Sequence, residues 1–222
     1  MLTGLIGKKL GMTRVGDASG RVQAVTVIQL GPCAVTQIKS APTDGYDAVQ
    51  VTFGKRKLSR TSSAARGHFQ KAEVAPGVAM REFAKRGDGE LKLGQALAAG
   101  DVFTLGDQVD VSGVTKGHGY AGVIKRHHFA GFPGSHGTHE YFRHGGSIGN
   151  RSYPGRVRKG MRMAGQMGNV KATTVNLKVV EILPDDNAIL VSGCVPGADG
   201  TLVIVRHSAK TRRVAQEAKA NG

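Results

Sequence analysis

Hydrophobic and polar residues largely alternate over much of the first 114 residues. Residues 21–30 are rich in Val and Ile, and residues 46–53 repeat the pattern after the turn signal Asp44-Gly45. Such alternation is typical of half-buried β-strands, whose successive side chains point to opposite faces of a sheet. The pattern predicts strands over residues 21–30, 34–39, 46–53, 78–83 and 101–114.

A second strand-rich region lies near the C-terminal end of the sequence. Residues 177–183 and 188–192 are apolar runs on either side of the Pro-Asp-Asp-Asn sequence at 184–187, which is a hairpin signature. Residues 202–206 predict one more strand. Together, the two regions predict a mainly β domain that is built from both ends of the chain.

The residues between these regions, 115–171, have no sustained apolar period. They contain ten Lys or Arg against one acid, Glu140, with six of the eleven aromatic residues, six of the eight His and many Gly. Cations neutralise phosphates, aromatic rings stack on unpaired bases, and Gly lets a backbone approach RNA closely. This composition predicts a long, extended, Gly- and Arg-rich insertion whose order comes from an RNA partner.

The charge of the whole chain agrees with a polyanionic partner. The 31 Lys and Arg exceed the 16 Asp and Glu, so the formal net charge is +15, of which the insertion carries +9. Such an excess indicates nucleic acid or an anionic membrane surface, because like charges repel in a compact state. The sequence has neither a basic amphipathic face nor a run near the roughly 18 apolar residues of a membrane span, which favours nucleic acid.

These patterns predict the domain organisation. Residues 61–74 predict a short helix with Ser62 or Ser63 as its N-terminal cap. Doubled back as a hairpin, the insertion has arms of about 28 residues that reach on the order of 90 Å at about 3.3 Å per residue. The expected parts are a β-barrel domain (1–114 and 172–209, with an irregular or helical part at about 55–98), an RNA-penetrating extension (115–171) and a basic flexible tail (210–222).

Other chemistries are less well supported by the insertion. The Gly-x-Gly-x-x-Gly sequence at 117–122 matches a dinucleotide fingerprint, but residues 123–137 contain three Gly and one Pro and do not predict the required helix. Ser135, His136 and Glu140 lack the strained elbow that activates a nucleophile. We therefore expect no catalytic residues, no cofactor and no small-molecule substrate.

The histidines of the insertion raise the question of a metal. His127, His128, His136, His139 and His144 have only Glu140 and no Cys near them, and no two are spaced by four residues on a predicted helix. Stacking and hydrogen bonding to RNA is the favoured interpretation, and no metal is expected. Cys33 and Cys194 lie far apart in the sequence, which is typical of reduced thiols in a cytosolic protein.

Several sequence blocks, in order, resemble one family. In residues 103–126, Phe103, Asp110, Gly113, Thr115, the Gly-His-Gly at 117–119, Gly122 and Arg126 stand at the spacing of the large ribosomal subunit protein three signature. Further similar blocks are GLIGKKLGMT at 4–13, residues 25–39 and 44–54, GSIGN at 146–150, PGRVRKGMRMAGQMGN at 154–169 and VPGADG at 195–200. The resemblance covers nearly the whole chain and is closest to bacterial members.

The resemblance implies a β-barrel of the translation-protein type, with a long internal insertion that runs into large-subunit RNA. It further implies binding near the 3′ end of 23S rRNA, an early role in assembly, an insertion tip that approaches the peptidyl-transferase centre, and large-subunit proteins fourteen and nineteen as neighbours. Residues 146–152 would lie near the tip and residues 156–162 on the returning arm. Asn150 stands where many bacterial members carry a methylated Gln, so that modification is not expected here.

The expected function is therefore that of a structural, non-catalytic RNA-binding protein of the cytoplasmic large ribosomal subunit. One rival is a nonspecific nucleic-acid-compacting protein, and a second is a metal-dependent RNA enzyme that uses the histidines. The residues expected to contact rRNA are Lys8, Lys9, Arg14, Lys116, His118, Lys125, Arg126, His127, His128, Arg143, His144, Asn150, Arg151, Arg156, Arg158, Lys159, Arg162 and Lys171.

Overall fold

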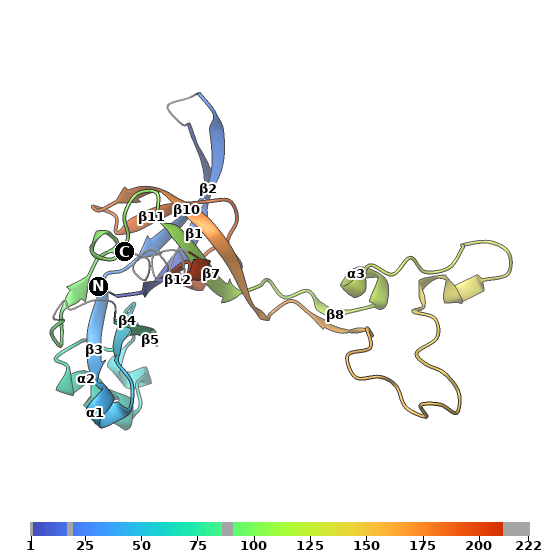
Figure 1. Ribbon diagram of the computed structural model, residues 1–222, viewed down its shortest axis with the longest axis horizontal. Helices are drawn as coiled ribbons and strands as arrows, with labels where there is room; N and C mark the ends of the chain where they lie inside the picture. The colour runs from blue at the N-terminus through green and yellow to red at the C-terminus, as the bar shows by residue number, and fades with distance from the viewer. Residues whose placement is uncertain (1, 17–19, 86–90, 211–222) are drawn as a thin grey trace, which may run out of the picture. The chain divides into compact units, whose positions relative to one another are not determined.

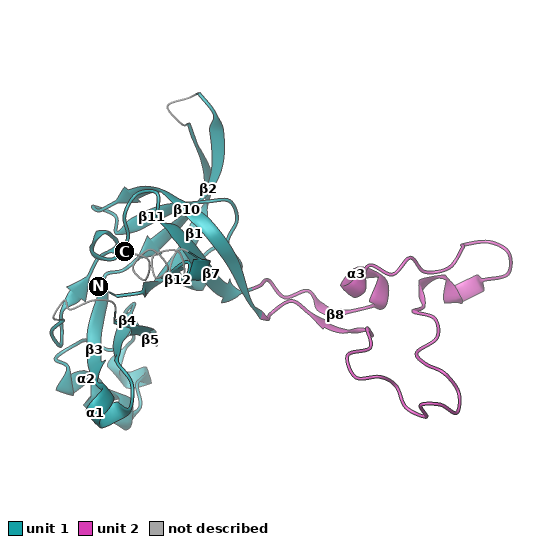
Figure 2. Cartoon of the chain, in the orientation of Figure 1, with its two compact units in different colours: residues 1–114, 171–222 teal, residues 115–170 magenta. Residues whose placement is uncertain are grey.

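The computed structural model describes residues 2–16, 20–85 and 91–210. The chain forms two compact units, which we call the body (Met1–Val114 and Lys171–Gly222) and the extension (Thr115–Val170) (Figure 2). Lys171, which the sequence patterns assign to the insertion, is the first residue of a body strand and pairs with Val114. The predicted basic tail lies, except for Lys210, outside the described residues.

A closed six-stranded barrel forms much of the body (Figure 1). The first strand of the chain pairs with the last strand on one side and with the second strand on the other, so both ends of the chain close the barrel. All neighbours are antiparallel, which confirms the mainly β barrel that the sequence predicts. The strands, in barrel order, are β1 (Gly4–Gly16), β12 (Leu202–His207), β7 (Gln108–Val114), β10 (Lys171–Leu183), β11 (Ala188–Ser192) and β2 (Val22–Leu30).

The body also contains a second, four-stranded sheet. Its order is β5 (Ala79–Ala84), β4 (Ala48–Phe53), β3 (Cys33–Lys39) and β6 (Ala96–Leu97). The sequence patterns placed residues 1–114 in one β-barrel domain and did not distinguish β3 and β4 from the barrel strands. The chain leaves the barrel at Gly31-Pro32, where Gly31 has a φ of 99° that other residues rarely adopt, and β3 starts the new sheet immediately afterwards.

Short helices fill the connections of the second sheet. The prediction of a helix within residues 61–74 is confirmed by α2 (Ser63–Lys71), and the Ser62 Oγ accepts a hydrogen bond from the Ala65 N–H as its N-terminal cap. Further helical segments in the described part of the body include α1 (Ala41–Asp44) and the 3-10 turns η1 (Leu58–Arg60) and η2 (Ala99–Asp101).

The strand prediction for residues 101–114 holds only in its second half. β7 begins at Gln108, and the preceding residues turn instead. The Asp107 carboxylate accepts a hydrogen bond from the Thr104 N–H at 2.8 Å, and Gly106 between them has a positive φ of 85°. The local side-chain bond and the glycine favour a turn over a continuous strand. The predicted hairpin at 184–187 is confirmed, since it joins the paired strands β10 and β11.

One hydrophobic core joins the barrel to the second sheet. Alternate residues of the barrel strands point inward, as in β12, where Val203 and Val205 are fully buried. The large side chains of Phe83 from β5 and Phe103 from the segment before β7 belong to the same cluster of buried residues. Burial of such side chains contributes roughly 1.5–3 kcal/mol each, so the body has a core that supports its own fold.

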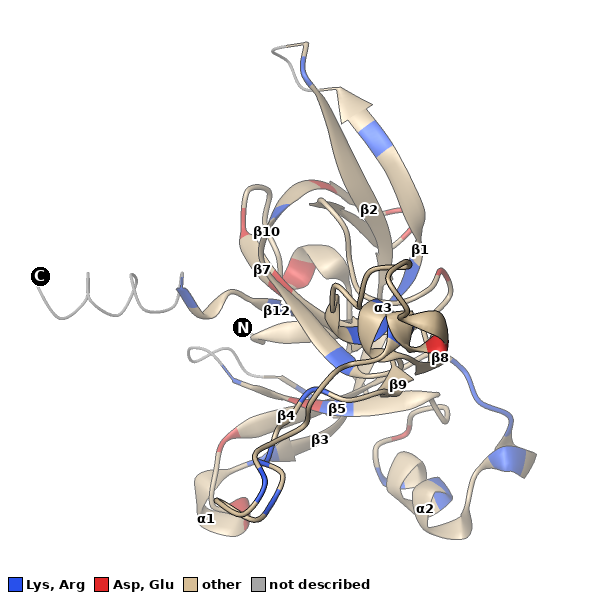
Figure 3. Cartoon of the chain, turned by 90° about the vertical axis from the view of Figure 1, so that its right-hand side faces the viewer, with Lys and Arg blue, Asp and Glu red and all other residues tan. Residues whose placement is uncertain are grey.

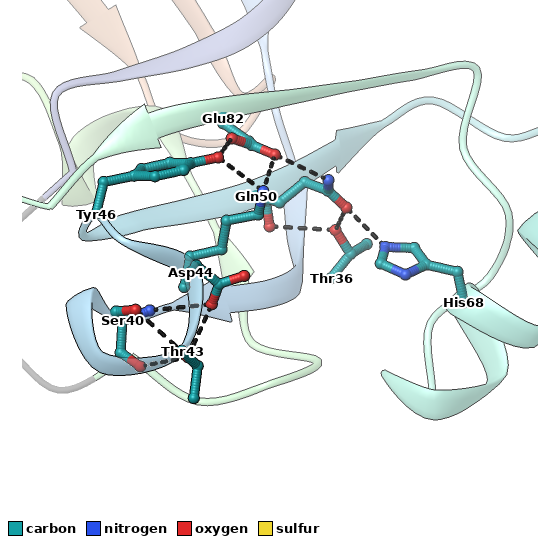
Figure 4. Close-up of polar contacts among 9 residues, drawn as sticks. Thr36, Ser40, Thr43, Asp44, Tyr46, Gln50, His68 and Glu82 are labelled. Carbon is teal, nitrogen blue, oxygen red and sulfur yellow. Dashed lines mark hydrogen bonds and ion pairs between the residues drawn. The ribbon is translucent and has the colours of Figure 1, made fainter.

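A polar network lies on the second sheet (Figure 4). Lys39 Nζ donates to Tyr46 Oη at 2.7 Å and pairs with Glu82 Oε1 at 2.9 Å, and the Tyr46 hydroxyl donates to Glu82 Oε2 at 2.8 Å. Hydrogen bonds from Lys39 and then from Tyr46 lower the pKa of the Glu82 carboxyl. The hydrogen bonds to Tyr46 and Glu82 in turn raise the pKa of Lys39. The network links β3 to β5 through Tyr46, which lies just before β4.

Candidate nucleic-acid interface

The two arms of the extension begin as a paired ribbon. The Thr115 N–H donates to the Val170 carbonyl at 2.9 Å, and β8 (Gly119–Ala121) pairs antiparallel with β9 (Gly165–Met167). Gly168 has a φ of 71°, and a Cβ there would overlap the Lys116 carbonyl oxygen. Glycine is therefore required at Gly168 for the arms to approach so closely.

A single helical turn follows β8. The sequence did not predict it, but α3 (Val123–His127) starts directly after Gly122 and ends at His128, which has a left-handed φ of 59°. This helix has five residues, and β8 pairs antiparallel with β9, so the segment does not form the parallel strand-helix-strand unit of a dinucleotide site.

Arg126 and His127, at the end of α3, contact the returning arm. Arg126 Nη1 donates to the Met163 carbonyl at 2.7 Å, and His127 Nε2 lies 3.1 Å from the same oxygen. A Cβ on Gly165 would lie 2.7 Å from Arg126 Nη1, so the guanidinium packs on that glycine. Both residues were predicted as RNA contacts. In the structure, their side chains also connect the two arms through the Met163 carbonyl.

The extension has almost no core. Ala121 is the only buried residue among 115–170, and residues 139–153 are exposed without interruption. The aromatic side chains of Tyr120, Tyr141 and Tyr153 are 79%, 61% and 87% exposed. Exposed rings on a segment without a core are available to stack on bases. Tyr153 was not among the predicted contacts, although its place in a Lys- and Arg-rich segment was visible in the sequence.

A basic hollow forms where the loop after Gly149 folds back on itself. It has a volume of about 540 Å³ and is lined by Asn150, Tyr153, Pro154, Arg156, Arg158 and Lys159. Four of these six were predicted as RNA contacts, and the structure brings them together. Three cations with a neighbouring amide and an exposed ring can hold a phosphate and an adjacent base.

A second hollow of about 480 Å³ lies around His144. Its lining includes Phe132, Thr138, Tyr141 and His144, and the Tyr141 and His144 rings are 4.7 Å apart between centroids. This hollow has aromatic walls, and no Lys or Arg is among its lining residues. It is suited to stacking, whereas the hollow around Arg156 is suited to phosphate.

The structure corrects the prediction for Lys9. Its side chain is 8% exposed, and Lys9 Nζ donates to the carbonyls of Val195 at 3.2 Å and Gly197 at 3.1 Å and lies 3.7 Å from Asp199 Oδ1. An ammonium with these partners is not available to a phosphate. Lys9 instead holds the Val195–Asp199 loop against β1, because its side chain lies on the inner face of that strand.

The other predicted contacts are accessible. Lys8 and Arg14 on β1 and Lys171 at the start of β10 are exposed, as are twelve of the fourteen predicted residues of the extension, Arg126 and His127 being half-buried. The extension carries nine Lys or Arg and the single acid Glu140 (Figure 3). Apart from the hollow around Arg156, the predicted residues are spread along the extension and do not converge on one point.

Among residues 2–16, 20–85 and 91–210, no three His, Cys, Asp or Glu are grouped as metal ligands. In the same part of the chain, no helix is long and apolar enough to cross a bilayer.

Comparisons with known proteins bear on the family of this chain. A family model described as ribosomal protein L3 matches residues 89–188. Proteins named large ribosomal subunit protein uL3 are similar over most of the chain. That of Acidothermus cellulolyticus is 48% identical over 93% of this chain and 93% of its own length. Those of Nitrosococcus oceani and Brachyspira hyodysenteriae are 47% and 46% identical over 95% of this chain and 99% and 96% of their own lengths. The chain therefore belongs to the uL3 family, whose members are structural components of the large ribosomal subunit and not enzymes.

Proposed function

We propose that this chain is a structural rRNA-binding protein of the large subunit, and that its extension lies within folded RNA. The observation that carries the proposal is the exposure of residues 115–170, where nine cations, one acid and a single buried residue, Ala121, occupy 56 residues. A segment that buries so little of itself gains too little free energy to order alone. Its cations select a polyanion as the partner that orders it.

The finer assignment rests on the resemblance to the family. We assign the RNA as 23S rRNA near its 3′ end, with an early role in assembly, large-subunit proteins fourteen and nineteen as neighbours, and a location on cytoplasmic ribosomes. The basic hollow around Arg156 and Asn150 supports a tip that is packed among RNA strands near the peptidyl-transferase centre. Any influence on peptide transfer is then indirect, through the shape of the surrounding RNA.

Competition binding tests the proposal against its main rival. The full-length protein, bound to labelled 23S rRNA at about 0.15 M salt, is challenged with unlabelled 23S rRNA or duplex DNA of equal phosphate concentration. A specific rRNA-binding protein is displaced far better by the RNA. Equal competition by the two nucleic acids would instead identify a nonspecific compacting protein, whose affinity comes only from counterion release.

The absence of a core in the extension predicts how the free protein behaves. In a ¹H–¹⁵N spectrum of the protein without RNA, the amides of residues 120–165 should be poorly dispersed and exchange rapidly, while those of the body are dispersed and protected. Binding of 23S rRNA should protect the extension. Dispersed, protected amides throughout 120–165 in the free protein would contradict the proposal that RNA orders this segment.

A further inference from the structure

The body carries a further hollow, and Lys8 is the one predicted RNA contact among its lining residues. Its volume is about 450 Å³, within the range of roughly 300–1,000 Å³ that is usual for small-ligand sites. It lies where the barrel meets the second sheet. It is lined by Lys8, Gln29, Gly200 and Leu202 from the barrel side, and by Gly31, Pro32, Phe53, Gly54, Lys55 and Val78 from the side of the second sheet.

Much of the lining is apolar, and part of it is open to solvent. Pro32, Phe53, Val78 and Leu202 contribute apolar surface, and Val78 and Leu202 remain 52% and 40% exposed. Apolar side chains that stay exposed around a hollow mark a surface that a partner can cover.

Two glycines shape the rim of this hollow. Gly54 has a φ of 78°, and a Cβ there would lie 3.2 Å from Val78 Cγ2. Gly200 has a φ of 85°, and a Cβ there would lie 3.7 Å from Lys8 Cε. Residues with a side chain would be strained at both positions. Glycine therefore leaves these two parts of the rim without side-chain atoms.

The polar groups of the hollow are cationic or neutral. No Asp or Glu lines it, and within the described part of the chain neither Lys8 nor Lys55 has an ion-pair partner. The acid next to Gly200 in the sequence, Asp199, lies 3.7 Å from Lys9 Nζ and so already has a cation beside it.

Further groups support an anionic ligand. Lys55 starts the basic run that continues with Arg56 and Lys57, and a backbone hydrogen bond from the Arg56 N–H to the Pro76 carbonyl at 2.8 Å holds this run in place. The Gln29 side-chain amide makes no hydrogen bond among the described residues and is both a donor and an acceptor. The hollow thus combines apolar walls, one free amide and two free ammonium groups.

We infer that this hollow binds one unpaired nucleotide of the RNA. The base lies against Val78, Leu202 and Pro32, the Gln29 amide hydrogen-bonds its polar edge, and Lys8 and Lys55 hold the flanking phosphates. The inference rests on the proposed function, since an RNA must be present for one of its nucleotides to enter. A nucleotide fits this chemistry because it joins a flat ring with a polar edge to anionic groups on either side.

Photo-crosslinking tests the inference directly. Large-subunit RNA is transcribed with 4-thiouridine or with 6-thioguanosine, bound to the full-length protein and irradiated, and the modified residues are identified by mass spectrometry. We expect adducts on residues that line the hollow, such as Phe53, Lys55 and Gln29, in addition to adducts on the extension.

Three variants make the result specific. Val78→Trp fills the hollow without changing charge, and K8Q/K55Q removes both cations. K71Q/K92Q is the matched control, because Lys71 and Lys92 are exposed body lysines that do not line the hollow. Adducts in the hollow should fall about fivefold or more in Val78→Trp. The salt slope should become shallower by about 1.4 in K8Q/K55Q relative to K71Q/K92Q, for two contacts at about 0.7 each. Thermal unfolding of each variant verifies that the body is folded.

The outcomes separate this inference from the proposed function. If the wild-type protein binds the RNA and crosslinks through its extension, but gives no adduct in the hollow, the nucleotide site is wrong and the proposed function stands. Adducts that persist in Val78→Trp also overturn the site. If the full-length protein does not prefer 23S rRNA to duplex DNA, both the nucleotide site and the proposed function are wrong. Displacement of the RNA from the hollow by hexaglutamate, but not by hexauridylate, would assign the hollow to an acidic protein segment.

Discussion

Lys8 and Lys9 are adjacent in β1 but have opposite environments. Lys8 is exposed, whereas Lys9 is buried and bonded to the loop that starts at Val195. Leu10, which follows, is 48% exposed, so the usual order of apolar-inside and polar-outside is reversed at this point. The sequence could not reveal this, because the inward face of β1 is set by its pairing with β12 and by an irregularity between Lys9 and Gly11 in its pairing with β2.

The buried ammonium predicts a large effect on stability. Lys9→Met leaves the carbonyls of Val195 and Gly197 without their donor, so the free energy of unfolding should fall by about 1–3 kcal/mol. Lys8→Met is the matched control on the same strand and should change it by less than about 0.5 kcal/mol. Urea unfolding followed by circular dichroism measures both. Equal effects of the two substitutions would show that the contacts of Lys9 contribute nothing.

The Glu82 network predicts a dependence of stability on pH. The folded state lowers the pKa of Glu82, so its carboxylate stabilises the fold above the unfolded pKa of about 4.3. This contribution is lost as the pH falls through the lower, folded pKa. Glu82→Gln should therefore reduce the midpoint of thermal unfolding at pH 7 and have a smaller effect at pH 2. Glu181→Gln, at an exposed position of β10, is the control, and a pH-independent effect of Glu82→Gln would contradict the argument.

At the scale of elements, the cations of the extension are most closely spaced on its returning arm. Replacing Arg156, Arg158, Lys159 and Arg162 with Ala should weaken RNA binding and reduce its salt slope by up to about 3–4, because about 0.7–0.9 counterions are released per neutralised phosphate. Filter binding between 50 and 200 mM salt measures the slope. The unfolding of the body should not change, because all four residues are exposed. An unchanged slope would mean that these side chains do not contact phosphate.

Local patterns predicted most strands, but not how they are grouped. Alternation identified β2 and β4, and an apolar run after a turn signal identified β11, because these patterns are the same whichever sheet a strand joins. The separation of β3 and β4 into a second sheet depends on pairing between distant segments, which periodicity does not contain. For the same reason, composition singled out the segment that we propose to bind RNA, while the grouping of Arg156, Arg158 and Asn150 around one hollow needed coordinates.

For the whole molecule, the pairing of Val114 with Lys171 makes the extension removable. Replacing residues 115–170 with an Asn-Gly turn should leave a folded body. Its free energy of unfolding should rise by up to about 3 kcal/mol, because a two-residue loop costs less entropy to close than a 56-residue loop. Affinity for 23S rRNA should fall strongly. Calorimetry and filter binding measure the two effects.

A second replacement separates loop length from charge. A Gly/Ser linker of 56 residues in place of residues 115–170 keeps the long loop and removes every cation. Its stability should equal that of the wild type, and its RNA affinity should match that of the Asn-Gly variant. A body that unfolds in both variants would show that the extension is needed for the fold.

The closure of the barrel by β1 and β12 also sets an order of events during synthesis. The extension is complete at Val170, but β12 ends only at His207, 37 residues later. At about 5–20 residues per second, this interval lasts roughly 2–7 s. During this interval, the cationic extension of the nascent chain is already available, whereas the barrel cannot yet close because β12 is incomplete. Capture by RNA can therefore precede folding of the body, and the first polyanion that the chain meets competes for it before its final shape exists.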